Sequence, residues 1–385
     1  MLRSPTSRPA RLVLPLLAAL CAAVALFPPG AAGSRALQVG IMDDAQVRGF
    51  PDRAFAELGV LRPEVLRVML WWNEVAPNRP ANPRDPAAYN WGVYDDIAIR
   101  AKAKGINVVF TIIGTPSWAN GGRPRNIAPT TPGVTLKDFS YAAAKHFSGL
   151  YTRASDGQTI PVVSRWTAWN EPNLRFWLRP QSFRPGRYLR ALAGVYARMC
   201  NSVMAGVHLA GAERHIRERV ACGVTAPVRK GTLSASPITF LRAVKAARAK
   251  FDVWAHHPHP RGRDNPPTAR PRQRGAVTLG NIGDLVKELT RLYGRKKLWL
   301  TEFGYQTNPP DRQVGVSRRI QARWMKTAFT IARRNPRIDM LVWFLIRDEP
   351  DLNGSRRGAP GWQSGLIGAG GARKPSFTTF RQLPR

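Results

Sequence analysis

Short apolar runs rich in β-branched and aromatic residues recur along the chain, separated by stretches long enough for a helix. Several runs are apolar at almost every position, which is typical of strands covered on both faces. We therefore predict eight strands. They span Gln38–Asp43, Val65–Trp72, Ile106–Ile113, Val162–Trp169, Val203–Gly211, Phe251–His256, Leu298–Phe303 and Ile338–Ile346.

Between these runs, apolar residues repeat at the spacing of one helix face, as in Tyr188–Met199, Leu285–Tyr293 and Ile320–Ile331. Alternating strands and helices imply a parallel sheet, and eight such units imply a closed (β/α)8 TIM barrel of the α/β class. We expect a single domain over 34–385. An open doubly wound sheet is the alternative fold, but Ile41–Asp44 stands where a dinucleotide site would have its Gly-rich turn.

The N-terminus has the order of a secretory signal peptide. Arginines precede an apolar run from Leu12 to Phe27, and small residues follow. The run is shorter than the roughly 20 residues that a membrane span requires. We expect 1–33 to be cleaved and the domain to be secreted, with retention on the cell envelope as a variant. The alternative is an uncleaved N-terminal anchor.

The charge balance narrows the choice of partner. Lysine and arginine number 59 against 24 aspartate and glutamate, which gives a formal net charge of +35. Such a charge favours anionic partners but does not define a fold. Acidic polysaccharides and anionic envelope polymers are therefore candidates. Nucleic acid is not expected, because no recognised binding motif accompanies the charge and the chain is predicted to be exported. No cofactor is indicated.

Two glutamates stand at the carboxyl ends of predicted strands, where a (β/α)8 barrel places its chemistry. Glu171 follows the apolar run that ends at Trp169, and Glu302 follows Leu298–Thr301. A carboxylate beside a packed core is costly unless it is paired or functional. Two carboxylates about 5 to 5.5 Å apart are what a retaining glycosidase requires. The alternative is that each is an ordinary rim carboxylate in a salt bridge.

The motif around Glu171 carries a resemblance to a known group of enzymes. Asn170-Glu171-Pro172 resembles the acid/base motif of the clan of (β/α)8 retaining glycoside hydrolases with catalytic glutamates on strands four and seven, in particular its cellulase-like and β-xylosidase-like families. Further matches are Arg67, which supports the nucleophile in the clan, and Thr115–Ala119 at the substrate cleft. Trp343 matches the aromatic that floors the subsite of the attacked sugar. The resemblance extends from Leu37 to Phe380.

The resemblance implies a secreted O-glycoside hydrolase that works by double displacement on a poly- or oligosaccharide. Glu302 would be the nucleophile, kept ionised by Arg67, and Glu171 the acid/base. Asn170 would hydrogen-bond the sugar 2-hydroxyl. The alternative class is a non-catalytic protein that holds an anionic glycan or envelope polymer on a glycosidase-like barrel. The presence of both glutamates favours the enzyme.

The sequence departs from the clan after strand six. The clan commonly has His-x-Tyr there, and this chain has His256-His257-Pro258-His259. His257 fills the histidine position, and His259 stands where tyrosine usually hydrogen-bonds the nucleophile. An imidazole can donate that bond but also charges near neutral pH, which leaves the pH optimum and the substrate subclass open. The three histidines could alternatively bind metal. We expect no metal site, because adjacent strand residues point to opposite faces.

Aromatic side chains at strand ends are candidate plates for a sugar ring. This group consists of Trp72, Trp118, Trp343 and Tyr305. Two other tryptophans, Trp166 and Trp169, are interpreted as core in preference to subsite. The remaining acids near predicted rim ends are interpreted as supporting or structural groups: Glu74, Glu213, Asp348 and Glu349.

The loop 258–275 after strand six has five arginines, five prolines and one acid. Its arginines are Arg261, Arg263, Arg270, Arg272 and Arg274, and Arg347, Arg356 and Arg357 are expected on the same barrel face. One interpretation is a solvated loop on a basic protein. The other is a clamp for a negatively charged glycan or envelope polymer, because the guanidinium fork matches carboxylate or phosphate.

Two cysteines, Cys200 and Cys222, remain after removal of the predicted signal peptide. Disulfides persist in oxidising compartments, so we expect these two to pair. The bond would link the end of the fourth helix to the loop after the fifth strand. Two separately buried thiols are the alternative.

Overall fold

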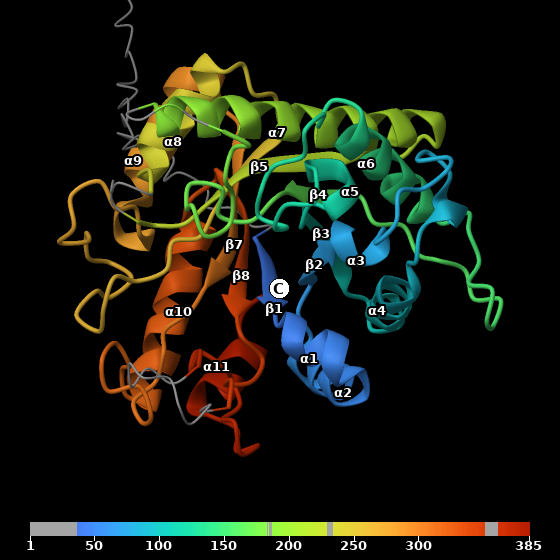
Figure 1. Ribbon diagram of the computed structural model, residues 1–385. Helices are drawn as coiled ribbons and strands as arrows, with labels where there is room; N and C mark the ends of the chain where they lie inside the picture. Colours follow the sequence, from blue (N-terminus) through green and yellow to red (C-terminus); the bar gives the residue numbers. More distant parts are fainter. Residues whose placement is uncertain (1–36, 183, 185–186, 229–233, 351–360) are drawn as a thin grey trace, which may run out of the picture.

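The computed structural model describes residues 37–182, 184, 187–228, 234–350 and 361–385. Eight parallel strands pair in chain order and close into a barrel, which confirms the predicted (β/α)8 fold (Figure 1). The strands are β1 (Gln38–Met42), β2 (Val65–Trp71), β3 (Asn107–Ile113), β4 (Arg165–Ala168), β5 (Arg219–Thr225), β6 (Val253–His256), β7 (Lys297–Phe303) and β8 (Ile338–Phe344).

Helices lie around the outside of the barrel (Figure 1). They are α1 (Asp44–Gly49), α2 (Pro51–Leu61), α3 (Trp72–Val75), α4 (Gly92–Ala103), α5 (Ser117–Asn120), α6 (Thr135–His146), α7 (Tyr188–Glu213), α8 (Pro237–Ala246), α9 (Ile282–Tyr293), α10 (Arg318–Arg334) and α11 (Pro375–Arg381), with short 3-10 helices η1 (Pro86–Ala88) and η2 (Leu279–Asn281). The three helices predicted from periodicity lie within α7, α9 and α10. In α10, for example, Met325, Phe329 and Ala332 are buried at helix spacing.

The fifth strand is the one strand that the sequence placed wrongly. The predicted strand Val203–Gly211 is the second half of helix α7, and β5 begins at Arg219 instead. Helix α7 packs against α6 so closely that a Cβ on Gly206 would lie 2.2 Å from the Lys137 carbonyl oxygen. A helix buried between a barrel and another helix is apolar on most of its surface, so its sequence has the apolar run of a covered strand.

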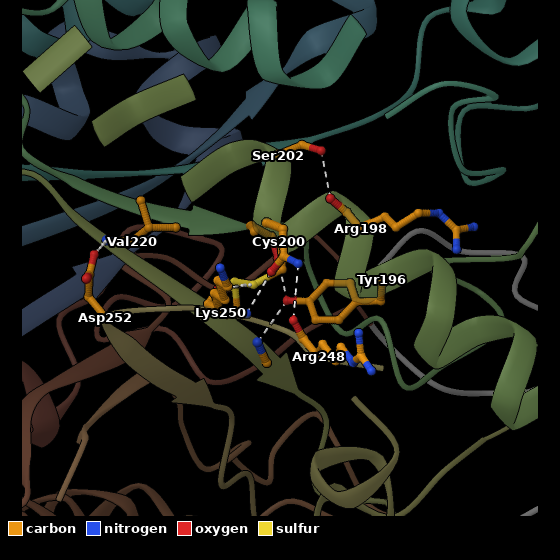
Figure 2. Close-up of a disulfide and its surroundings, with 12 residues drawn as sticks. Tyr196, Arg198, Cys200, Ser202, Val220, Arg248, Lys250 and Asp252 are labelled. Carbon is orange, nitrogen blue, oxygen red and sulfur yellow. Dashed lines mark hydrogen bonds between the residues drawn. A yellow bond between two sulfur atoms is a disulfide. The ribbon is translucent and has the colours of Figure 1, made fainter. Parts of the chain in front are cut away.

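A disulfide joins helix α7 to strand β5 (Figure 2). The Cys200–Cys222 pairing is therefore confirmed, but both of its expected attachment points were wrong. Cys200 lies in the middle of α7, and Cys222 lies inside β5 and not in the loop after it. Beside the bond, the Asn201 amide donates to the Arg248 carbonyl at 3.2 Å and accepts from the Lys250 N–H at 2.7 Å. The bond thus fixes a helix of the outer layer to the barrel wall.

Helix α11 lies at the place where the chain closes the barrel. Strand β1 pairs with β8 along five residues, from Gln38↔Met340 to Met42↔Phe344. Helix α11 contacts both α2 and α10, the helices on the two sides of this junction. Arg385 donates hydrogen bonds to the carbonyls of Leu61 and Arg62 at 2.9 Å each. The first and last parts of the described chain therefore pack against each other and are joined by hydrogen bonds.

The predicted signal peptide, residues 1–33, lies outside the described residues. Within the described part of the chain, no helix combines the length and the apolar character needed to cross a bilayer.

Candidate active site

A sharp turn at the end of β4 presents Glu171. Trp169 and Glu171 both have left-handed backbone conformations, with φ of 71° and 38°. Non-glycine residues adopt this region only where neighbouring structure holds them, and such residues cluster at functional sites. The neighbouring strands supply that support, since the Trp169 N–H donates to the Ile112 carbonyl at 2.9 Å and the Glu171 N–H to the Val224 carbonyl at 3.0 Å.

Glu302 lies within β7 and is held by a fully buried arginine. Arg67 Nη1 donates to Glu302 Oε1 at 2.5 Å. The rest of the guanidinium is fixed by Thr111 Oγ1 at 2.9 Å from Nε and by Asn170 Oδ1 at 2.8 Å from Nη2. This one side chain therefore ties together strands β2, β3 and β7 and the turn after β4. The structure brings together Arg67, Asn170 and both glutamates.

Two histidines complete the cluster. His257 is fully buried, and its Nδ1 lies 3.1 Å from Glu171 Oε1 and 3.5 Å from Glu302 Oε2. His259 Nε2 lies 3.2 Å from Glu302 Oε2. Ionised carboxylates only accept hydrogen bonds, so we assign an N–H to the imidazole nitrogen that faces Glu302 in each case. His259 therefore contacts the carboxylate that tyrosine contacts in the clan.

The third histidine of the segment is turned away from the glutamates. His256 Nδ1 lies 2.8 Å from Thr225 Oγ1, and its Nε2 lies 3.0 Å from the Val277 carbonyl. The three histidines thus form no common ligand set. His257 Nδ1, His259 Nε2 and Glu302 Oε2 do lie within 4.8 Å of one another, and atoms of these types can ligate a metal. Each histidine nitrogen already faces a carboxylate, so the contacts are accounted for without an ion.

The electrostatic environment separates the two glutamates. Burial and the negative charge of Glu302 raise the pKa of Glu171 to about 8. Burial opposes ionisation of Glu302 as well, but the electrostatic effects of His257 and Arg67 and the hydrogen bond from His259 outweigh it and hold the pKa of Glu302 well below its ordinary value. Burial lowers the pKa of His257 well below its ordinary value, so this ring is neutral at pH 7. One protonated and one ionised carboxyl therefore share the site.

A cavity of about 830 Å³ opens above this cluster. Asn170, Glu171, His259 and Glu302 lie on its wall, and Trp177, Phe344 and Trp362 supply aromatic surface. The volume falls in the range of small-ligand sites, and aromatic faces suit the apolar face of a sugar ring. Phe344 and Trp362 contact each other with ring centroids 5.4 Å apart, and both contact His259.

Three of the four aromatic residues expected at the cleft are buried in the core, and the fourth, Trp118, is partly buried against it. Trp72, Trp343 and Tyr305 are at most 2% exposed, and Trp118 packs edge-on against Trp72. The polar atoms of three of them bond to backbone carbonyls: Trp118 Nε1 to Ala76, Trp343 Nε1 to Ser364 and the Tyr305 hydroxyl to Asn265. None of the four lines the cavity. Trp166 and Trp169 are buried as well, as their core interpretation predicted.

The error at β8 has a simple physical reason. Successive side chains of a strand point to opposite faces, so only one of the adjacent Trp343 and Phe344 can face the barrel axis. Trp343 is buried against Phe303 and is not on the cavity wall, whereas Phe344 lines the cavity. The sequence contained both rings, and the resemblance selected the wrong one. Trp362 was missed because it lies beyond the strand, in an irregular segment with no periodic signal.

Two aspartates at the end of β1 were also missed as site residues. Asp43 accepts the N–H groups of Ile346 and Arg347 at 3.1 Å each, and burial raises its pKa to about 7. Asp44 accepts the Met69 N–H at 2.9 Å, and burial raises its pKa to about 6. Both line the cavity. The sequence could have indicated them, because both follow the first strand directly and the carboxyl ends of all eight strands meet at this face.

Of the four acids interpreted as structural, three pair with neighbours away from the cavity, and Glu349 lines it. Glu74 pairs with Arg48, Asp348 with Lys374 and Glu213 with the Tyr141 hydroxyl. Glu213 ends helix α7 and is not at a strand end, because the fifth strand begins later than predicted.

One arginine of the arginine-rich loop 258–275 contributes to the cavity wall. Arg261 lines the cavity, and its Nε donates to Gln273 Oε1 at 3.0 Å. Arg270 makes two hydrogen bonds to Asp284, so this guanidinium is already paired. The other loop arginines, Arg263, Arg272 and Arg274, are exposed. Arg356 and Arg357 lie outside the described residues.

The structural neighbours of the chain are glycoside hydrolases of families 39 and 5. They include a family 39 glycoside hydrolase from Bacteroides cellulosilyticus WH2 (16% identity, TM-score 0.62, 90% of this chain and 63% of that chain). A glucosidase from Croceicoccus marinus is similar (15% identity, TM-score 0.61, 91% and 66%). The GH5_18 protein from Streptomyces cattleya, solved with GlcNAc, has 15% identity and a TM-score of 0.58 (91% and 80%).

The chain thus spans slightly less than two thirds of the length of the first two of these structures. At such identities the likeness establishes the (β/α)8 fold. No family model and no curated protein sequence matches the chain.

Proposed function

We propose that this chain is a secreted retaining O-glycoside hydrolase in which Glu302 is the nucleophile and Glu171 the acid/base. The observation that carries the proposal is the pairing of a protonated and an ionised carboxyl across His257 in one cavity. Glycoside hydrolysis by double displacement requires these two protonation states at once. The glycoside hydrolase neighbours are consistent with it.

The separation of the two carboxylates supports retention of configuration. Their oxygens lie 3.1 and 3.5 Å from the same His257 nitrogen, so the two oxygens are no farther apart than the sum of these two distances. Retaining enzymes have carboxyl groups about 5 to 5.5 Å apart, whereas inverting enzymes need roughly 6.5 to 9.5 Å to admit a water. The shared contact with His257 therefore keeps these two oxygens near or below the lower end of the inverting range.

The proposed reaction follows from the positions of the side chains. Glu302 attacks the anomeric carbon while Glu171 donates its proton to the departing oxygen, which breaks the glycosidic bond and forms a glycosyl-enzyme. Glu171 then accepts a proton from water, and the hydroxide released at that step displaces Glu302. Arg67 keeps Glu302 ionised before the attack and stabilises it again as a leaving group. Asn170 is placed to bond the sugar 2-hydroxyl.

A screen of aryl glycosides, with the anomer of the first product followed by proton NMR, tests the proposal. We expect a retained product, a loss of about 10³-fold or more for Glu302→Ala, and rescue of Glu171→Ala by azide with retained configuration. An inverted first product from the wild type contradicts retention. Saturable polysaccharide binding without hydrolysis of any glycoside would instead favour the non-catalytic binding protein.

The finer substrate class that we propose is an anionic glycan. The support is the exposed charge of Arg263, Arg272 and Arg274 in the loop that reaches the cavity through Arg261. Exposed ion pairs weaken as salt shortens the Debye length from about 30 Å at 0.01 M to about 8 Å at 0.15 M. Replacing Arg263, Arg272 and Arg274 by serine should raise KM for the polymer and flatten its salt dependence. The kcat/KM for a small neutral aryl glycoside should stay nearly unchanged.

A further inference from the structure

A second basic feature lies outside the cavity, along the first half of helix α7. Four arginines line a hollow of about 360 Å³: Arg184, Arg187, Arg190 and Arg198. We refer to it as the arginine groove. The groove includes no residue of the loop 258–275 and no residue of the catalytic cavity.

The helix spacing explains why the arginines surround a hollow. Arg187, Ala191, Gly194 and Arg198 follow one another at intervals of four, three and four residues, so they lie on one face of α7. The stripe is about 16 Å long. Ala191 has a small side chain and Gly194 has none, so the helix surface between Arg187 and Arg198 is hollowed. The Arg198 guanidinium lies 3.8 Å from the point where a Cβ on Gly194 would project, so this arginine leans over the glycine.

The charge of the groove is uncompensated within the described chain. No ion pair between described residues includes any of its four guanidinium groups, and no acid lines it. The neighbouring residues outside the description are Phe183, Pro185 and Gly186, which carry no charge. Some other surface arginines do face carboxylates, as Arg270 faces Asp284 and Arg100 faces Asp52. Four like charges around one hollow repel one another, and a polyanion removes that repulsion.

We propose that the arginine groove binds an acidic polysaccharide strand; this rests on the proposed glycosidase function, which makes the occupant a distal part of the substrate. In a (β/α)8 barrel the helices run back against the strands, so the N-terminal end of α7 lies at the face where the strands end. Figure 1 shows this green end of α7 on the side from which the gold loop 258–275 projects. One end of a strand seated in the groove therefore lies at the face where the barrel strands end.

The shape of the groove favours a glycan strand over a lipid surface. A planar bilayer contacts convex surfaces, whereas these arginines surround a hollow. Membrane-surface helices also present large apolar side chains beside their basic residues. The described residues of the groove include no exposed large hydrophobic residue. Guanidinium forks bind sugar carboxylates through paired hydrogen bonds, and each added carboxylate along a strand can meet a further arginine.

The test measures binding, so that it does not depend on catalysis. Isothermal titration calorimetry would follow an oligogalacturonate of about ten sugars, and its neutral methyl ester, on the Glu302→Ala chain. A groove variant replaces the four arginines by glutamine. A matched control replaces four exposed cations of helix α10, Arg319, Arg323, Lys326 and Arg334, and changes the net charge equally. A second groove variant, Gly194→Glu, places a carboxylate beneath Arg198 at an open helical position.

We expect the oligogalacturonate and not its ester to bind. The groove variant should weaken binding about tenfold or more, since four exposed ion pairs are lost, and the α10 control less than threefold. Gly194→Glu should weaken it in the same direction as the groove variant. Equal losses in the groove variant and the α10 control would show that net charge alone attracts the polymer, and would overturn the proposal.

Further outcomes distinguish glycan binding in the arginine groove from membrane binding and from the glycosidase proposal. If the groove variant loses binding to phosphatidylglycerol vesicles and keeps oligogalacturonate binding, the occupant is a membrane and the proposal is wrong. If the chain hydrolyses no glycoside but the groove variant still loses oligogalacturonate binding selectively, the groove stands and the glycosidase proposal fails. A groove variant that binds like the wild type, while aryl glycosides are hydrolysed, overturns the groove alone.

Discussion

Replacing Glu302 by glutamine should lower the pKa of Glu171 by about two units. The substitution keeps the size of the side chain and leaves one acceptor oxygen to face Arg67, and it removes the negative charge. Burial and that charge are the two largest causes of the raised pKa of Glu171. Removing a neighbouring like charge makes ionisation easier, so the pKa must fall.

The magnitude follows from the geometry. Both carboxylates contact His257 Nδ1, at 3.1 and 3.5 Å, and we take a charge separation of about 6 Å, which both distances allow. At an effective dielectric constant of about 20, two unit charges at that distance repel by about 2.8 kcal/mol, which is about two pKa units. From a starting pKa of about 8, Glu171 should titrate near pH 6 in the variant. Burial should keep it above its ordinary value.

Carbon-13 NMR of glutamate labelled at the side-chain carboxyl measures this pKa directly and does not require activity. In the wild type, kcat/KM should fall as the pH rises through about 8, because Glu171 loses the proton that it must donate. Glu349→Gln is the matched control, because Glu349 lines the cavity but is not among the groups that shift Glu171. If the Glu171 pKa is the same in wild type and Glu302→Gln, burial alone sets it and the paired-carboxyl argument is wrong.

Three further predictions concern the support of the site. Arg67→Met should lower kcat/KM by about 10²-fold or more and move the acidic limb of the pH profile upward, because Arg67 stabilises the ionised nucleophile; an unchanged acidic limb would contradict this role. Phe344→Ala should raise KM for aryl glycosides, whereas the buried Trp343→Phe should change the free energy of unfolding more than KM, as denaturation and steady-state kinetics would show. Replacing Cys200 and Cys222 by serine should lower the free energy of unfolding by about 3 kcal/mol in urea, and two alkylatable thiols in the native wild type would show that the bond does not form.

The sequence predicted the barrel and the meeting of Glu171 and Glu302 at one face because both depend on short-range patterns. Apolar runs followed by Glu171 and Glu302 mark strand ends, and strand ends of a closed barrel meet at one face. The strand placed at Val203–Gly211 failed for an equally physical reason. Helix α7 is covered on one side by the barrel and on another by α6, so its second half lost the amphipathic pattern that separates helix from strand.

The aromatic wall could not be predicted, because it depends on which of two adjacent rings faces the axis. Trp343 and Phe344 are adjacent in β8, and no local signal in the sequence shows which of the two side chains faces the barrel axis. Trp362 reaches the cavity from a segment without secondary structure, where its position depends on contacts such as that of its N–H with Glu349 Oε2 at 2.7 Å. Such contacts join residues far apart in sequence or in irregular loops, and they appear only in three dimensions.

The closed order of the strands has a consequence for proteolysis. Every strand pairs with a neighbour on both sides, so the sheet has no free edge. A single cut in the exposed loop 258–275 would divide the chain into one piece with β1–β6 and another with β7 and β8. The two pieces would still be joined by strand pairing at β6–β7 and at β8–β1. A barrel built this way can be cut once by a protease and remain one folded assembly.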